Sequence, residues 1–194
     1  MSVPNVKLRQ AFLDLVEQKF GQPPQRVMAG RPTRGPAKEV YRVDGKTFRL
    51  RTNNKPCLMA KVENADADAP LPFEGEDLVG IAFPAEHNGI VVGYLVPATV
   101  AAKAMRDAHC KWLASEARRE RSGDNQTRVL RFDGDTALLW FGYAKRWAKY
   151  KIGEIEIDAQ PVASALDLEI ANARRRIAAA AGKPESAIRI AIDY

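Results

Sequence analysis

The sequence EVYRVDGKTFRLRT, residues 39–52, predicts a β-hairpin around which the rest of the fold is organised. Val40, Tyr41 and Val43 are β-branched or aromatic residues, and the Asp44-Gly45 that follows them is a strong signal for a two-residue turn. Four basic side chains fall on the same short stretch, namely Arg42, Lys46, Arg49 and Arg51. The pattern therefore predicts a β-sheet core that carries a positive surface.

The composition favours one basic domain without a membrane segment. The 194 residues suffice for one well-buried domain, or for a domain with a small appendage. Lys and Arg number 30 against 24 Asp and Glu, and the net charge of +6 favours a polyanionic partner without identifying one. No apolar run approaches the roughly 20 residues that span a bilayer, and the N-terminus lacks the pattern of a secretory signal. We therefore expect a cytoplasmic protein with no membrane partner.

The sequence contains only two cysteines and two histidines. Cys57 and Cys110 have no C-x-x-C spacing, so we expect two reduced thiols and neither a disulfide framework nor a zinc site. We expect a structural role for both histidines, His87 and His109. The phosphate-loop, dinucleotide-binding, serine-esterase and zincin motifs are all absent. We therefore expect no cofactor and none of the four corresponding chemistries.

The residues before the hairpin predict a helix and an extended arm. Residues 5–20 place apolar side chains at three- and four-residue spacing, with Asn5 as the expected N-cap. Residues 22–38 are rich in Pro and Gly, which prevents a regular element. This arm carries Arg31 and Arg34 among its basic residues, and it either follows a phosphate backbone or is a solvated linker.

The residues after the hairpin predict further strands and a covering helix. Residues 57–62 predict a third strand, and the acidic residues 63–77 predict an exposed loop. The strands expected at 77–83 and 89–96 are nearly continuous in apolar residues. Such strands are typical of a sheet covered on both faces, and an amphipathic helix that begins at Pro97 fits this role.

Residues 140–150 combine aromatic side chains at helical spacing with three cations, Lys145, Arg146 and Lys149. In one interpretation the aromatic rings stack on bases while the cations pair with phosphates. In the other, which is the more common outcome for such a pattern, the aromatic stripe packs into the core. The cations form a positive wet face in both interpretations.

The chain is expected to divide into a core domain, residues 1–152, and a small C-terminal β-α-β unit, residues 153–194. Two short strands of the smaller unit, at 154–157 and 188–192, are expected to pair with each other across a helix. The expected fold class is α/β (α+β), with a central mixed β-sheet flanked by helices.

The order of these elements resembles the core of restriction-endonuclease-like, PD-(D/E)xK, proteins over about residues 5–150. In active members an acidic residue on the first hairpin strand and an (E/Q)-x-K triplet on the second strand hold a divalent metal. The matching residues here are Glu39 and Arg49-Leu50-Arg51. Arginine side chains do not ligate Mg²⁺ and are not deprotonated near neutral pH. The resemblance therefore implies a nuclease-like scaffold that lacks its cleavage centre.

Three functions are compatible with these features. The leading one is non-catalytic binding of nucleic acid, above all DNA, through phosphate contacts of the hairpin, the arm and the aromatic segment. The residues expected to make these contacts are Arg31, Arg34, Arg42, Lys46, Arg49, Arg51, Lys145, Arg146 and Lys149. The alternatives are a Mg²⁺-dependent nuclease with Glu39 and Asp44 in its site, and a regulatory protein that docks on a protein partner.

The leading function depends on the direction in which two arginines of the hairpin point. If Arg49 and Arg51 face solvent, they form a surface for phosphates. If they pair instead with the acidic residues at 74–77, the positive surface is cancelled within the molecule.

Overall fold

The computed structural model describes residues 3–27, 39–63, 68–85, 89–114, 126–134 and 136–157, together with Ala173, Ile177 and Ala178. The chain divides into two compact units, residues 1–157 and 158–194. In the second unit the three described residues are helical, and Ile177 is 47% exposed.

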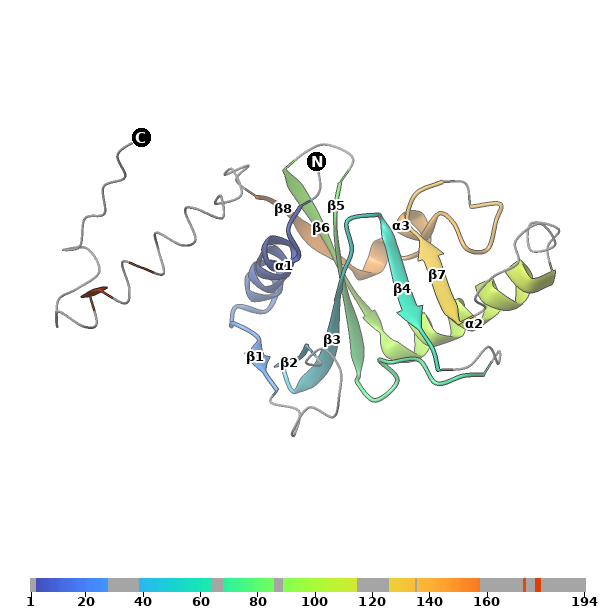
Figure 1. Cartoon of the computed structure of the whole chain (residues 1–194), viewed down its shortest axis with the longest axis horizontal. Coiled ribbons are helices and arrows are strands. Elements are labelled where there is room, and N and C mark those ends of the chain that lie inside the picture. The colour runs from blue at the N-terminus through green and yellow to red at the C-terminus, as the bar shows by residue number, and fades with distance from the viewer. Residues whose placement is uncertain are drawn as a thin grey trace. The chain divides into compact units, whose positions relative to one another are not determined.

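The first unit has an α+β fold with a mixed six-stranded sheet, a two-stranded sheet and three α-helices packed against them (Figure 1). No helix in the described ranges is long and apolar enough to cross a membrane. In chain order the elements are α1 (Asn5–Phe20), β1 (Gln25–Arg26), β2 (Val40–Val43), β3 (Lys46–Thr52), β4 (Cys57–Lys61), β5 (Leu78–Pro84), β6 (Ile90–Pro97), α2 (Ala98–Ala114), β7 (Thr127–Arg131), α3 (Tyr143–Arg146), the 3₁₀ turn η2 (Ala148–Tyr150) and β8 (Lys151–Glu156).

The hairpin predicted from residues 39–52 is confirmed. β2 and β3 pair antiparallel, with Tyr41 opposite Phe48 and the two rings stacked at 5.4 Å between centroids. Asp44 and Gly45 both have positive φ, 48° and 72°, as a two-residue hairpin turn of type I′ requires. Asp and Gly tolerate this backbone conformation better than other residues, which explains why the turn forms here.

The large sheet has the strand order β1-β2-β3-β5-β6-β8, in which only β3 and β5 pair parallel. The third strand predicted at residues 57–62 is present as β4, which pairs with β7 in a separate two-stranded sheet and not with the hairpin. The burial patterns agree with the pairing of β3 with β5 instead of β4. All the interior residues of β5 are buried, as a central strand requires, whereas β4 exposes Met59 and Lys61 on one face.

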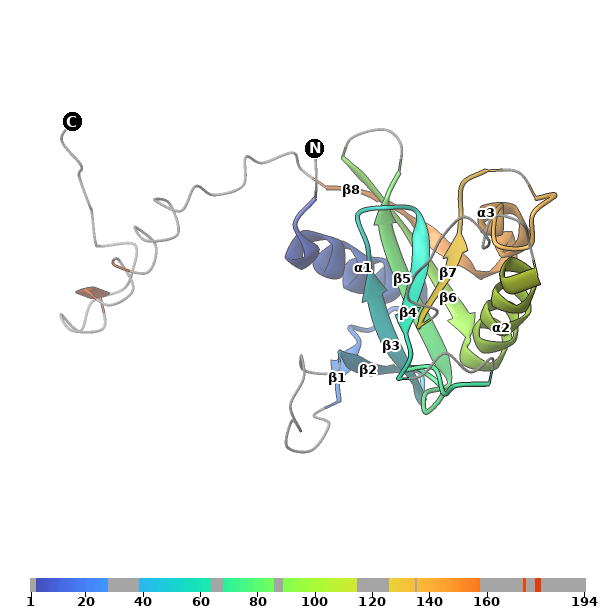
Figure 2. The same ribbon diagram turned by 45° about the vertical axis from the view of Figure 1, so that its right-hand side comes forward.

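Both faces of the large sheet are covered, as the apolar strands predict. Helix α1 lies on one face, where Leu8, Phe12 and Val16 pack against β3, β5 and β6. The other face is covered by β4, β7, α2 and α3, which enclose a second core around Leu58 and Leu130 (Figure 2). The sheet is therefore the middle layer of three.

Helix α1 approaches the sheet closely because glycines face it. A Cβ atom on Gly80 would lie 2.7 Å from Phe12 Cζ, and a Cβ atom on Gly93 would lie 2.8 Å from Leu15 Cδ1. The helix begins at Asn5 after Pro4, which occupies the N-cap position, so the expectation that Asn5 caps it is wrong. The Pro4 carbonyl instead accepts the first hydrogen bonds of the helix.

The aromatic segment forms two short elements, α3 and η2, rather than one helix over residues 140–150. Tyr143 and Trp147 are buried, and both rings contact Phe132 in the core. The core interpretation of this stripe is therefore confirmed for these two residues. Trp140 and Tyr150 are partly buried against the same core.

The boundary of the first unit differs from the expected one. Residues 154–157 were expected to begin the C-terminal unit, but β8 pairs antiparallel with β6, with Ile155 opposite Val91. Ile152 and Ile155 pack against the α1 core, which explains why this strand belongs to the large sheet. The first unit ends at Ile157, and the strand expected at 188–192 lies outside the described residues.

Replacing Gly80 by Ala tests the close approach of α1. The added methyl group would collide with Phe12, and overpacking of this kind lowers the free energy of unfolding by about 1–3 kcal/mol. Gly75→Ala is the matched control, since nothing lies within 4 Å of its added Cβ. Urea unfolding should give a lower free energy of unfolding for Gly80→Ala than for the wild type. The double variant Gly80→Ala, Phe12→Leu should recover part of this loss, because the smaller side chain makes room for the added methyl group. Equal stability of the two single variants would contradict this packing.

Candidate anion-binding groove

Arg49 forms an ion pair with the acidic loop and does not face solvent. Its Nη2 atom donates a hydrogen bond to Oε1 of Glu76 at 2.5 Å, and the two side chains are only 11% and 9% exposed. Because both groups are withdrawn from water, their attraction is weakly screened. The structure thus shows the internal pairing that removes this arginine from the positive surface.

Arg51 lies on the same face of β3 as Arg49 and is partly buried. Burial, and then the neighbouring Arg49 cation, lower the pKa of Arg51, while Glu76 opposes this change. The guanidinium nevertheless stays protonated near neutral pH. No ion pair of Arg51 is found within the described ranges, and its buried Nε atom has no hydrogen-bond partner there. Arg51 therefore adds positive potential to this face from beneath its surface.

Asp77 holds the first residues of β3. Its Oδ2 atom accepts hydrogen bonds from the backbone N and the Oγ1 atom of Thr47, at 2.8 and 2.9 Å. These bonds, the backbone one first, lower the pKa of the Asp77 carboxyl. A lowered pKa in the folded state means that these bonds stabilise the fold above the ordinary pKa of Asp. That contribution is lost as the pH falls through the lowered value.

The acidic segment is more than an exposed loop, which corrects the expectation for residues 63–77. In its described part Leu71 and Phe73 are buried in the core between the two sheets. The Glu74 carboxylate accepts from the Leu71 backbone N at 2.7 Å and pairs with Arg106 of α2 at 2.7 Å. The sequence pattern showed the charge of this segment, but the burial of its few apolar residues determined its position.

A groove with four lysines lies at one end of the large sheet. The register brings together at this end the starts of β3, β5 and β8 and the end of β6. The last turn of α1 and the β2–β3 turn complete the walls. The groove has a volume of about 220 Å³, and its lining residues are Lys19, Phe20, Val43, Asp44, Lys46, Leu78, Leu95, Pro97, Lys149, Tyr150, Lys151 and Ile152.

The groove combines an apolar floor with a cationic rim. We call Lys19, Lys46, Lys149 and Lys151 the groove lysines; all four are exposed, and Asp44 is the only carboxylate among the lining residues. Lys151 pairs with Glu154 at 2.6 Å, whereas no ion pair of the other three is found in the part of the chain described. An anion at this rim would meet an excess of positive charge.

The other predicted phosphate-binding residues lie elsewhere or have structural contacts. Arg42 and Lys145 are exposed but do not line the groove. Arg146 donates through Nη2 to the Thr136 carbonyl oxygen at 2.5 Å and through Nε to that of Phe141 at 3.3 Å. Its guanidinium therefore holds the segment that precedes α3. Arg31 and Arg34 lie outside the described residues.

The carboxylates expected for a nuclease do not converge. Glu39 pairs with Arg9 of α1 at 2.9 Å, and Asp44 lies at the opposite end of β2 in the hairpin turn. Within the described ranges no group of three or more His, Cys, Asp and Glu side chains is arranged to hold a metal ion. The geometry therefore gives no support to the nuclease alternative.

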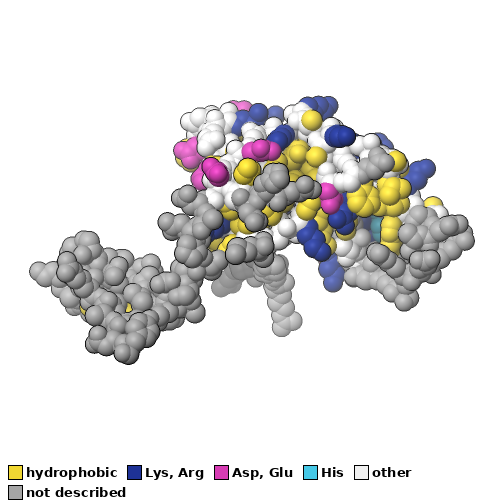
Figure 3. All heavy atoms as spheres, turned by 90° about the horizontal axis from the view of Figure 1, so that it is seen from above, with side chains coloured by type: hydrophobic (Ala, Val, Ile, Leu, Met, Phe, Trp, Pro, Cys, Tyr) yellow, Lys and Arg dark blue, Asp and Glu magenta, His cyan; other side chains and the backbone are white. Residues whose placement is uncertain are grey.

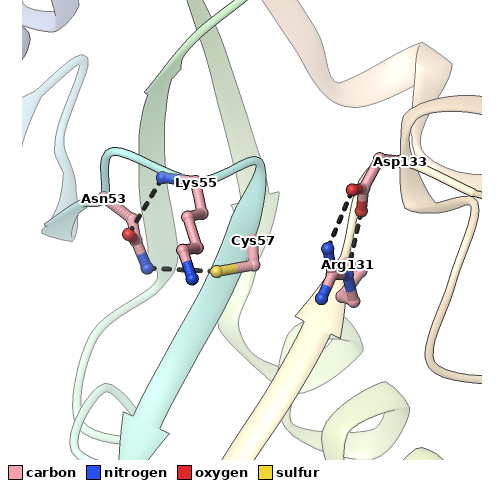
Figure 4. Close-up of polar contacts among 5 residues, drawn as sticks. All are labelled: Asn53, Lys55, Cys57, Arg131 and Asp133. Carbon is pink, nitrogen blue, oxygen red and sulfur yellow. Dashed lines mark hydrogen bonds and ion pairs between the residues drawn. The ribbon is translucent and has the colours of Figure 1, made fainter. Parts of the chain in front are cut away.

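A second polar cluster lies between the start of β4 and the end of β7 (Figure 4). Asn53 Oδ1 accepts from the Lys55 backbone N at 3.1 Å, and Asn53 Nδ2 donates to Cys57 Sγ at 3.0 Å. Across the strand pair, Arg131 donates to both carboxylate oxygens of Asp133 at 3.1 and 3.0 Å. Burial raises the pKa of the Cys57 thiol, so it stays protonated and unreactive at neutral pH. This cluster is structural.

We found no match to the chain among family models, curated proteins or solved structures. Lys46 and Lys149 were both predicted as phosphate-binding residues, and the structure brings them together at the groove. Lys19 and Lys151 were not predicted, because Lys19 ends an amphipathic helix and Lys151 lies just beyond the aromatic segment, so neither belonged to a pattern that indicated phosphate binding. Only the register of the strands and the position of α1 bring them together.

Replacing Arg49 by Met tests whether this arginine is structural. The change leaves Glu76 buried without its partner, and loss of one member of a buried pair costs about 3–5 kcal/mol of unfolding free energy. Arg42→Met is the matched control, because Arg42 is exposed on the same hairpin and should change stability by less than about 0.5 kcal/mol. Chemical unfolding measures both. Similar small losses in the two variants would show that Arg49 is not required for stability.

Proposed function

We propose that the protein is a non-catalytic nucleic-acid-binding protein whose phosphate contacts are made by the groove lysines. The observation that carries this proposal is that four lysines from α1, β3, η2 and β8 surround one groove. Lysine side chains bind phosphates as mobile point charges, and each contact releases condensed counterions from the nucleic acid.

The distribution of charge favours the groove, rather than a broad positive surface, as the site of phosphate binding. Arg49, Arg106 and Arg131 each pair with a nearby carboxylate, so part of the net charge of +6 is compensated locally. Lys19, Lys46 and Lys149 have no such partner within the described residues. The groove is therefore a place where uncompensated charge is concentrated on a concave surface, which strengthens its field.

The nuclease-like scaffold remains part of the proposal. The order of α1, the β2–β3 hairpin, β5, β6 and α2 agrees with the element order on which the resemblance to PD-(D/E)xK proteins rests. At the position of the metal-binding triplet, Arg49 is occupied by its ion pair with Glu76. We accordingly propose a scaffold of this kind that binds nucleic acid without cleaving it.

The proposal is tested by replacing all four groove lysines with Gln and titrating a labelled oligonucleotide at about 50 and 200 mM salt. Log K should fall with log salt for the wild type. The slope should flatten in the variant by about 0.7–0.9 for each lysine that contacts a phosphate.

The control variant replaces Lys55, Lys61, Lys103 and Lys111 by Gln, which removes the same charge from exposed lysines outside the groove. We call these four the control lysines. If the groove is the binding site, this variant should keep the wild-type slope. Equal effects of the two variants would show that only net charge matters, and no binding by the wild type would end the proposal.

A second candidate function, docking on a protein partner, is favoured by exposed apolar surface. Leu138 is 47% exposed in the segment before α3, and Met59 is 45% exposed on β4. Figure 3 shows a face of the molecule on which hydrophobic side chains gather, with Lys and Arg side chains beside them. Patches of this kind are typical of interaction sites. This function becomes the leading one if the titration detects no binding of nucleic acid.

A further inference from the structure

We infer that the groove takes an unpaired base, so that the protein prefers single-stranded nucleic acid to a duplex. This inference rests on the proposed function and deepens it. Phosphate binding requires only the cationic rim, and it leaves the shape and the apolar floor of the groove unexplained. An unpaired base that enters the groove would contact this apolar floor.

The floor is apolar and concave. Phe20 and Ile152 line it from α1 and β8, and Leu95 lines it from β6. The volume of about 220 Å³ lies below the roughly 300–1,000 Å³ of pockets that enclose whole small ligands. Only part of a ligand therefore enters, and its charged remainder stays at the rim. A nucleotide has this division, with a flat, weakly polar base joined to a phosphate.

Tyr150 supplies an aromatic ring at the wall of the groove. Its ring is partly buried and packs against the core, so it is held in place. Lys149 Nζ lies 5.0 Å from the centroid of this ring. The ammonium group lies over the face of the ring, so a base that stacks on this face takes its place, and Lys149 is then free to pair with the phosphate of that nucleotide. Paired aromatic and cationic side chains of this kind are how single strands are bound without sequence preference.

A duplex fits the groove less well. Its bases are paired and stacked, so their flat faces are hidden, and the duplex presents only phosphates, sugars and the edges of the bases. Phosphates at the rim would leave the apolar floor in water, and a base enters only after the duplex is opened. The groove lysines would then bind a duplex while the floor contributes nothing.

The test compares three labelled probes of about 12 nucleotides, a length within the site sizes of single-strand-binding folds. The probes are an oligothymidylate strand, its duplex with oligoadenylate, and an abasic strand that keeps the sugars and phosphates. Anisotropy titrations at about 50 mM salt should give the thymidylate strand a dissociation constant roughly fivefold or more below that of the abasic strand. The duplex should also bind more weakly than the thymidylate strand.

Two substitutions of one residue assign this preference to the groove. Tyr150→Leu keeps an apolar side chain but removes the ring, and it should abolish most of the preference for the thymidylate strand over the abasic strand. Tyr150→Phe keeps the ring and should retain the preference, which controls for effects on folding. The salt dependence should be unchanged in both variants, since the groove lysines remain.

The outcomes separate this inference from the proposed function. Equal affinity for the thymidylate and abasic strands, or tighter binding of the duplex, would overturn the inference while leaving phosphate binding by the groove lysines intact. The inference also fails if Tyr150→Leu keeps the full preference. If none of the three probes binds in a salt-dependent manner, the proposed function and the inference fail together.

Discussion

The close packing of α1 against the backbone of the central strands fixes both the fold and the groove. Phe12 and Leu15 occupy the space that side chains at Gly80 and Gly93 would fill. This contact holds the helix against the sheet, and its last turn therefore brings Lys19 and Phe20 to the sheet end where the β2–β3 turn lies. A larger residue at either glycine would displace the wall of the groove as well as weaken the core.

The ion pair between Arg49 and Glu76 removes Arg49 from the cations that could contact a ligand. It neutralises the arginine at the centre of the basic hairpin and fixes the acidic loop that leads into β5. The hairpin thus stabilises the sheet through Arg49 and contributes to the groove through Lys46, the first residue of β3. Of the many basic residues in the sequence, the groove lysines are therefore the ones that we propose for anion binding.

Local patterns predicted the local elements correctly, whereas long-range pairing was beyond them. The Asp44-Gly45 turn and the apolar strands β5 and β6 were predictable because turn chemistry and burial act on neighbouring residues. The position of β4 in a second sheet, and of β8 beside β6, depended on competition between strands distant in sequence. The same limit applies to the groove, of which Lys46 and Lys149 were predicted and Lys19 and Lys151 were not.

The most direct measurement is acetylation of the lysines by a water-soluble reagent, mapped by mass spectrometry with and without a saturating single-stranded oligonucleotide. The account predicts that the oligonucleotide protects Lys19, Lys46, Lys149 and Lys151, because phosphates would occupy their ammonium groups. Lys55, Lys61, Lys103 and Lys111 are also exposed, and each should react at the same rate with and without the oligonucleotide. Protection of these control lysines, or equal protection of both sets, would contradict the assignment of binding to the groove.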